Sequence, residues 1–144
     1  MKELAAEARL TGAERVVIIG ERRGNPGILR VYEPSGETLA NIVTFIIKGV
    51  KLGREAGHGY PSTRRRLIVE VDGSPVADEF ADAMIVAFHA TVLEEPGEDD
   101  VVAVLRGLDE RTVLMHFKWR DREVGPVLRL GKPAQMVKRL EGRV

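Results

Sequence analysis

The sequence predicts an α/β fold with a mixed sheet, arranged as two similar halves. The first observation is an amphipathic helix at residues 75–88, placed between apolar strands at 67–71 and 101–105. Strand, helix and strand in that order predict a βαβ unit with parallel strands and a right-handed crossover. The second is a faint duplication, because helix, strand, basic turn and strand follow one another at residues 2–33 and again at 76–118. A strand precedes only the second copy, so we expect the first half to lack its initial strand.

The first segments predict a short helix and then two strands. Residues 2–10 place Leu4, Ala5 and Ala8 on one side, and Thr11-Gly12 ends the pattern. Residues 16–19 are apolar at every position, which predicts a strand covered on both faces. Residues 29–32 alternate between apolar and polar, as in a half-exposed neighbouring strand.

A basic loop at residues 20–27 joins these two strands. The residue before a proline is pushed toward extended backbone, and Pro26-Gly27 fits the two central positions of a type II turn. The loop should therefore hold one shape and present Arg22 and Arg23 at a sheet edge.

The segment at residues 39–52 fits both the helical and the strand periodicity of apolar residues. Apolar residues in the stretch 39–52 fit a helix at some positions and strands at others, but the β-branched residues and Gly49 favour a strand. Residues 53–63 have the glycine and proline content of a loop.

The βαβ unit has the clearest local signals. Ser74 is a suitable N-cap, and Pro75 fits the first helical position, where its missing N–H costs nothing. Asp78 and Glu79 lie near the positive end of the helix dipole. One apolar stripe is expected to face the core: Ala77, Phe80, Ala81, Met84, Ile85 and Phe88.

The remaining segments predict antiparallel strands. Residues 111–119 place Val113, Met115, Phe117 and Trp119 on one face, and a turn at 120–123 leads to a strand near 124–130. Pro126 should lie at an edge or a bulge. Pro133 can begin a short terminal helix with Met136, Val137 and Leu140 on its inner face.

Composition narrows the class of protein. The chain has 144 residues, which fits one compact domain, and we expect half-repeats at about 1–55 and 64–144. It has no cysteine, which excludes thiolate metal sites and thiol nucleophiles and gives no sign of an oxidising compartment. The longest apolar-rich stretch, residues 42–50, is too short to cross a membrane. We therefore expect a soluble, cytoplasmic protein.

The motifs of common enzymes and cofactor sites are missing. Neither GxxxxGK[ST] nor GxGxxG accompanies the glycine-bearing loop at 20–27, and no GxSxG surrounds a serine. The histidines, His58, His89 and His116, lack paired-ligand spacing, and the acidic residues at 94–100 lack the order of a calcium loop. We expect no cofactor, no metal and no small-molecule substrate.

Clustered basic residues are the candidate binding groups, although the formal net charge is zero, with 22 basic and 22 acidic residues. A solvated face is the ordinary interpretation of each cluster, and contact with phosphate is the alternative. Trp119, between two cations, is either a base-stacking platform or the last member of its apolar stripe. The candidate RNA contacts are Arg22, Arg23, Lys48, Lys51, Arg54, Arg64, Arg65 and Arg66.

Three segments resemble the Brix-domain family of ribosome-biogenesis proteins in its archaeal single-domain form. They are residues 19–32 with the run Arg-Gly-Asn-Pro-Gly, residues 45–55, and residues 123–130 with Gly-Pro followed by Leu-Arg-Leu. The resemblance implies one domain of two α/β halves, each like the anticodon-binding domain of class II aminoacyl-tRNA synthetases. It implies binding to ribosomal RNA or pre-ribosomal particles, without catalysis. The strand and Ser/Arg-rich motif that usually precede the first helix have no counterpart, so their role is not transferred.

Two classes of function remain in competition. The first is an RNA-binding assembly factor that contacts phosphates through the basic groups and recognises structured RNA by shape. The second is a protein-interaction module, whose acidic loop and open sheet edge would engage a basic ribosomal protein or assembly factor. A small phosphate-handling enzyme has only the glycine-bearing loop in its favour.

Overall fold

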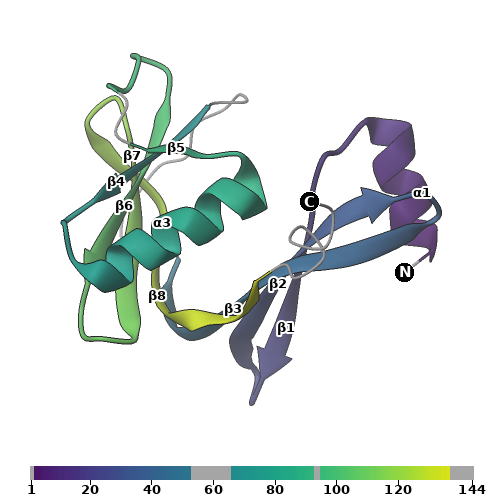
Figure 1. Ribbon diagram of the computed structural model, residues 1–144, viewed down its shortest axis with the longest axis horizontal. Coiled ribbons are helices and arrows are strands. Elements are labelled where there is room, and N and C mark those ends of the chain that lie inside the picture. The colour runs from purple at the N-terminus through teal and green to yellow at the C-terminus, as the bar shows by residue number, and fades with distance from the viewer. Residues whose placement is uncertain (1, 53–65, 93–94, 137–144) are drawn as a thin grey trace.

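Two helices pack against one sheet of eight strands in the residues that the computed structural model describes, 2–52, 66–92 and 95–136 (Figure 1). The α/β class and the mixed sheet predicted from the sequence are thus confirmed. The elements are α1 (Lys2–Thr11), β1 (Val16–Arg22), β2 (Asn25–Ser35), β3 (Thr38–Lys51), β4 (Leu67–Val71), α3 (Pro75–Phe88), β5 (Thr91–Val92), β6 (Val101–Gly107), β7 (Thr112–Trp119) and β8 (Arg122–Met136).

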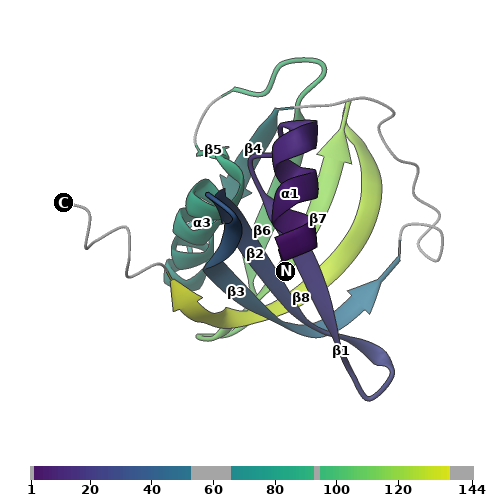
Figure 2. The ribbon, with the colours of Figure 1, turned by 90° about the vertical axis from the view of Figure 1, so that its right-hand side faces the viewer.

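The strand order is β1-β2-β3-β8-β7-β6-β4-β5. β4 is parallel to β6 and β5, whereas all other neighbours are antiparallel. The parallel pair β4 and β6, with α3 between them in the chain, confirms the predicted βαβ unit. Helix α1 precedes the antiparallel set β1-β2-β3, and α3 precedes the set β6-β7-β8. The two sets meet where β3, the last strand of the first set, pairs with β8, the last strand of the second set. This pairing joins both sets into one continuous sheet (Figure 2).

Helix α3 begins and packs as its sequence predicts, with one exception. The Ser74 hydroxyl accepts a hydrogen bond from the backbone N–H of Ala77, and Pro75 opens the helix. Phe80 is fully buried and its ring stacks on Phe45 of β3, with centroids 6.1 Å apart. The exception is Ile85, which is 41% exposed because it lies outside the face that contacts the sheet.

The prediction that residues 16–19 are covered on both faces is wrong. β1 forms one end of the sheet and, within the described residues, pairs with β2 alone. Val17 and Ile19 are 43% and 57% exposed, whereas Val16 and Ile18 on the opposite face are half-buried. An uninterrupted apolar run therefore does not distinguish a central strand from an edge strand here.

The ambiguous stretch 39–52 is a strand, as favoured from its β-branched residues: β3 extends to Lys51. The helix expected from Pro133 is wrong as far as residue 136, because β8 continues to Met136, opposite Val43. The predicted remainder of that helix lies outside the described residues. Pro126 lies where the register between β7 and β8 shifts, which confirms the expected bulge. The short strand β5 was not predicted.

Arg15 connects the segment before β1 to the C-terminal end of α3. Its Nε donates to the carbonyl of Ala87 at 2.9 Å, and its Nη2 donates to that of Val86 at 3.2 Å. Its Nη1 lies 3.6 Å from a carboxylate oxygen of Glu33 on β2. Carbonyls in the last turn of a helix have no intrahelical donor, so Arg15 satisfies groups that the helix cannot.

No helix of the described chain is long and apolar enough to span a membrane.

We predict that Phe80→Ala lowers the free energy of unfolding by about 3 to 5 kcal/mol, because it leaves a cavity beside Phe45 in the core. Ile85→Ala on the same helix is the matched control and should cost about 1 kcal/mol or less, because Ile85 is partly exposed. Urea unfolding followed by circular dichroism measures both. Equal losses in the two variants would contradict this packing of α3.

Candidate nucleic-acid interface

The basic loop at residues 20–27 is a tight hairpin, and its turn differs from the prediction. Arg22 pairs with Asn25, so Arg23 and Gly24 are the two turn residues, with φ of 52° and 82°. Positive φ at both positions is the type I′ geometry, which matches the right-handed twist of the two strands. The predicted type II turn at Pro26-Gly27 is therefore wrong, and Pro26 lies inside β2, opposite Glu21.

The hairpin presents its two arginines to solvent. Arg22 and Arg23 are exposed, and neither forms an ion pair within the described part of the chain. The stem of Arg22 lies over Gly27 on the facing strand, where any side chain would collide with it. Gly27 therefore gives Arg22 the space to lie across the hairpin.

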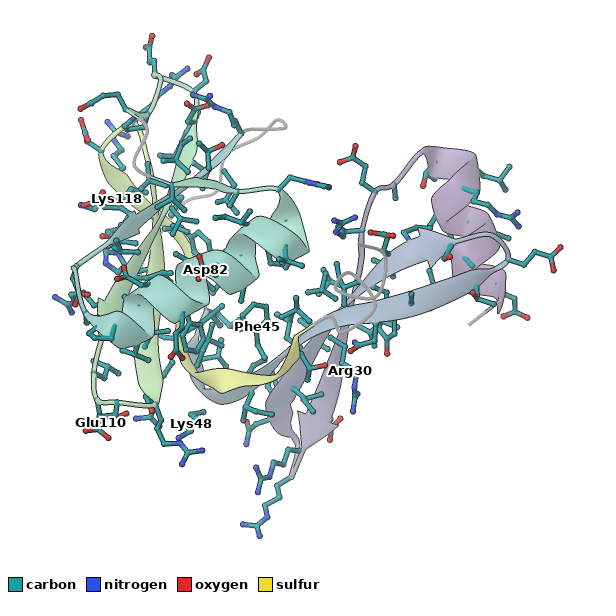
Figure 3. The ribbon with its side chains drawn as sticks, viewed as in Figure 1. Arg30, Phe45, Lys48, Asp82, Glu110 and Lys118 are labelled. Atoms are coloured by element: carbon teal, nitrogen blue, oxygen red, sulfur yellow. The ribbon has the colours of Figure 1, made fainter. Side chains whose placement is uncertain are left out.

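The lysines on β3 lie on the strand next to this hairpin. Lys48 is exposed, and its Nζ lies 3.5 Å from the hydroxyl of Thr112 on β7. Figure 3 shows Lys48 at the end of the sheet where β6 turns into β7, near the labelled Glu110. Lys51 is exposed at the end of β3. Because β2 and β3 are antiparallel, the start of β2 and the end of β3 lie at the same end of the sheet.

Arg66 is separate from these groups. In the sheet order, three strands, β8, β7 and β6, lie between β3 and β4, the strand that Arg66 precedes. Arg66 binds Asp100 through two hydrogen bonds, Nη2 to Oδ2 at 2.7 Å and Nε to Oδ1 at 3.3 Å. The predicted contacts Arg54, Arg64 and Arg65 lie outside the described residues. The structure thus places the hairpin and the β3 lysines on neighbouring strands at one end of the sheet, and Arg66 on the far side of three other strands.

Arg129 of β8 is a cation beside Lys48 that sequence reasoning did not include. Its Nη2 donates to the backbone carbonyl of Lys48 at 3.0 Å, and its side chain is exposed. The sequence could not show that Arg129 lies beside Lys48, because the pairing of β3 with β8 joins segments that are far apart in the chain. A signal was present nevertheless: Gly49 and Gly131 lie inside strands, where glycine often marks close approach of another group.

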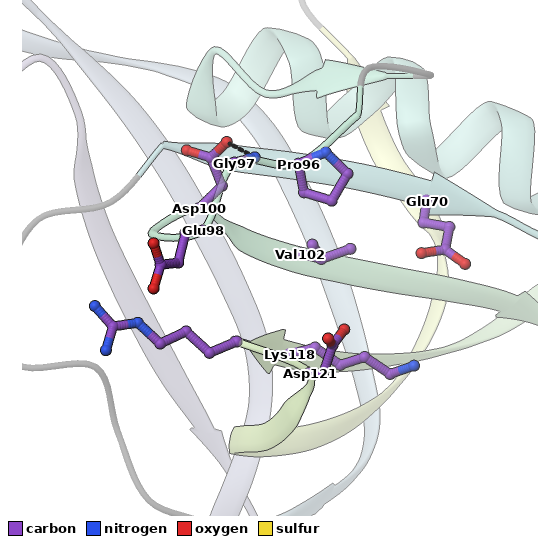
Figure 4. A pocket seen from close by; sticks show the side chains of 9 residues that line it. Glu70, Pro96, Gly97, Glu98, Asp100, Val102, Lys118 and Asp121 are labelled. Atoms are coloured by element: carbon purple, nitrogen blue, oxygen red, sulfur yellow. Dashed lines mark hydrogen bonds between the residues drawn. The ribbon is translucent and has the colours of Figure 1, made fainter.

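An acidic and basic cavity of about 350 Å³ lies beside β4, β6 and β7 (Figure 4). Asp100 accepts a hydrogen bond from the backbone N–H of Gly97 at 2.7 Å and closes the loop at its rim. Arg120 binds Asp99 at 2.6 Å and lies 4.6 Å from the centroid of the Trp119 ring. The lining residues are Glu70, Pro96, Gly97, Glu98, Asp100, Val102, Lys118, Arg120 and Asp121.

Trp119 is half-buried and lies beneath the guanidinium of Arg120. One face of its ring is therefore engaged in a cation-π contact, and a base that stacked on that face would have to displace Arg120.

Histidines and acids form no metal-binding group in the described ranges. His116 Nδ1 lies 2.9 Å from a carboxylate oxygen of Glu123, and His89 caps α3 with φ of 55°. His58 lies outside the described residues.

Comparisons with known proteins identify the family. No family model matches the chain. A curated relative from the archaeon Aeropyrum pernix is 53% identical over 142 residues, which cover 96% of this chain and 79% of the relative. That protein is named a probable Brix domain-containing ribosomal biogenesis protein. At this identity and coverage, the chain belongs to the Brix-domain family of ribosome-biogenesis proteins.

A solved structure supports the same assignment. The crystal structure of a probable ribosomal biogenesis protein from Aeropyrum pernix K1 superposes with a TM-score of 0.88 at 52% identity. The superposition covers 95% of this chain and 78% of the crystallised chain. The family resemblance found in the hairpin, in β3 and in β8 is thereby confirmed.

The ion pairs predict how stability depends on pH. The hydrogen bond from the Arg66 side chain, followed by that from the Gly97 N–H, lowers the pKa of the Asp100 carboxyl from its ordinary value. A carboxyl with a lowered pKa stabilises the fold above its unfolded value, and this contribution is lost as pH falls through the folded value.

We therefore predict that the free energy of unfolding falls as pH is lowered below about 4, and that Asp100→Asn makes this fall shallower. Urea unfolding at pH values from roughly 2.5 to 7 measures the effect, because carboxylates titrate within about this range. A variant that keeps the wild-type dependence on pH would show that Asp100 does not contribute.

Proposed function

We propose that this protein takes part in ribosome biogenesis by binding ribosomal RNA or pre-ribosomal particles in the cytoplasm, without catalysis. The observation that carries the proposal is the relative's name at 53% identity, which refers to ribosomal biogenesis. The exposed arginines of the β1–β2 hairpin and the lysines of β3 supply cations for RNA phosphates. Structured RNA is recognised largely by its shape and backbone, so such cations suit it.

We also propose that residues 1–144 form a single Brix-type domain with half-repeats at about 1–55 and 64–144. The sheet order supports this division, because a helix followed by three antiparallel strands occurs on each side of the β3–β8 pair. The likeness of each half to the anticodon-binding domain of class II aminoacyl-tRNA synthetases is part of the same proposal.

The hairpin arginines give the first test of RNA binding. We predict about micromolar or tighter binding to transcribed archaeal ribosomal RNA fragments at low salt, weakening steeply as salt rises. Arg22→Ala with Arg23→Ala should weaken binding about tenfold and reduce the slope of log K against log salt by about 1.4 to 1.8, if two phosphates are lost. Filter binding at several salt concentrations measures both quantities.

The control for this test is Arg9→Ala with Arg122→Ala, which removes the same charge from two exposed positions away from the hairpin tip and from Lys48. Binding that ignores salt, or an equal loss in the control, would contradict a role for the hairpin.

A protein-interaction module is the second candidate. The cavity between the acidic loop and β7 favours it, because Glu70, Glu98 and Asp121 line a recess that suits lysine or arginine side chains. The exposed apolar edge of β1 offers a second contact surface.

Affinity purification from an archaeal extract treated with ribonuclease distinguishes the two candidates. A stoichiometric protein partner that survives ribonuclease and is lost on Glu70→Lys with Glu98→Lys would support the second. Loss of all partners on RNA digestion would count against it.

A further inference from the structure

Two cationic side chains cross the seam between β3 and β8 in opposite directions, each over a glycine of the other strand. Lys48 lies at a bulge in β3, and its stem passes over Gly131 of β8. A methyl group on Gly131 would lie 2.9 Å from Lys48 Cε, closer than real side chains approach. Arg129 of β8 lies over Gly49, whose methyl group would lie 3.4 Å from its Nη2. The glycines thus leave the space that these cations occupy.

Hydrogen bonds place both charged ends. Arg129 Nη2 donates to the backbone carbonyl of Lys48 at 3.0 Å, and Lys48 Nζ reaches the hydroxyl of Thr112 at 3.5 Å. Thr112 is 5% exposed, so its hydroxyl is a fixed point of the sheet. A guanidinium has five N–H donors, so one bond to a carbonyl leaves donors that can reach a ligand. The two cations are exposed but restrained, so ordering their side chains on ligand binding would cost little conformational entropy.

A third cation lies in the same cross-strand row. Arg106 of β6 is opposite Leu114 of β7, which is opposite Arg129, which in turn is opposite Gly49. Directly opposite residues of neighbouring strands share one face of a sheet, so Arg106 and Arg129 lie on the same face. Both are exposed.

Acidic residues lie near Lys48 (Figure 3) without forming an ion pair with it in the described residues. Asp109 is close enough that the charge of Lys48 contributes to lowering its pKa, after larger effects that begin with the hydrogen bond from the Arg111 N–H. No ion pair links Lys48 or Arg129 to an acid within the described ranges. The two seam cations are therefore not committed to ion pairs with acids of the described chain.

We propose that Lys48 and Arg129 form a preorganised site for a backbone phosphate of structured RNA, on the face of the sheet that also carries Arg106. This inference rests on the proposed function and assigns Arg129 to the site for the first time. Phosphate suits the arrangement because a guanidinium and an ammonium donate several charge-assisted hydrogen bonds to its oxygens. Contacts of this kind position an RNA backbone without reading its sequence.

Removal of the two charges tests the site. Lys48→Met with Arg129→Gln keeps two long side chains over the glycines but no charge. We expect it to weaken binding to transcribed archaeal 16S and 23S ribosomal RNA about tenfold, and to lower the salt slope by about 0.7 to 1.8, for one or two lost phosphates. Arg9→Gln with Arg122→Gln is the matched control and should leave both near wild type, because both arginines are exposed and Arg122 lies at the far end of β8 from Arg129.

Gly131→Ala tests the geometry without changing any charge. Its methyl group would displace the Lys48 stem, which is flexible enough to move, so the fold should persist. We expect weaker RNA binding with wild-type stability in urea. Wild-type binding by this variant would overturn the preorganised placement of Lys48.

The outcomes separate the two proposals. If the wild-type protein binds RNA, but Lys48→Met with Arg129→Gln matches it in affinity and salt slope, the seam site is overturned and the RNA-binding function stands. If the wild-type protein binds none of these RNAs, both proposals are overturned. Inorganic phosphate added at up to about ten times the RNA concentration should not compete, because a single free anion lacks the backbone's multiple contacts. Full competition would indicate a site for free phosphate and overturn the RNA assignment.

Discussion

The pairing of β3 with β8 is the constraint on which the rest of the structure depends. Each of these strands is the last member of its own antiparallel set, and their pairing joins segments that lie about eighty residues apart in the chain, as the contact of Arg129 with Lys48 illustrates. Ile47 and Leu130 meet in this pair and are both buried. Phe45, in the same strand, supports α3 through Phe80. Without the seam, each set would have an exposed edge, and α3 would lose part of its surface.

The same pairing explains how cations can be placed on a sheet face. Basic side chains normally extend into solvent, and their positions are spread over many rotamers. Glycines at facing positions remove the neighbouring side chain, so a long cation can lie along the backbone and bind a carbonyl or hydroxyl. Gly27 under Arg22, Gly49 under Arg129 and Gly131 under Lys48 are three examples in this chain. In contrast, Arg66 and Arg120 are bound by Asp100 and Asp99.

Local signals in the sequence were sufficient for some elements and not for others. The α3 helix could be predicted because its cap, its first proline and its period all lie within a few turns. The exposure of Val17 and Ile19 could not, because it depends on β1 being at the end of the sheet. The turn at Arg23-Gly24 was missed because Pro26-Gly27 is a good local turn sequence, whereas the twist of the paired strands favours the type I′ geometry. Among the candidate cations, the hairpin arginines could be proposed from the sequence, whereas Arg129 became a candidate only with the register of β8.

Arg15 makes the two sets of strands depend on each other in a way that the sheet alone does not. It lies before β1 of the first set, yet it donates hydrogen bonds to carbonyls in the last turn of α3, the helix that covers the second set. When the first set opens, α3 loses donors for those carbonyls as well as its contact with Phe45. Hydrogen exchange in the last turn of α3 should therefore follow the opening of β1 and β2, so that a protein with two topologically similar parts behaves as one cooperative unit.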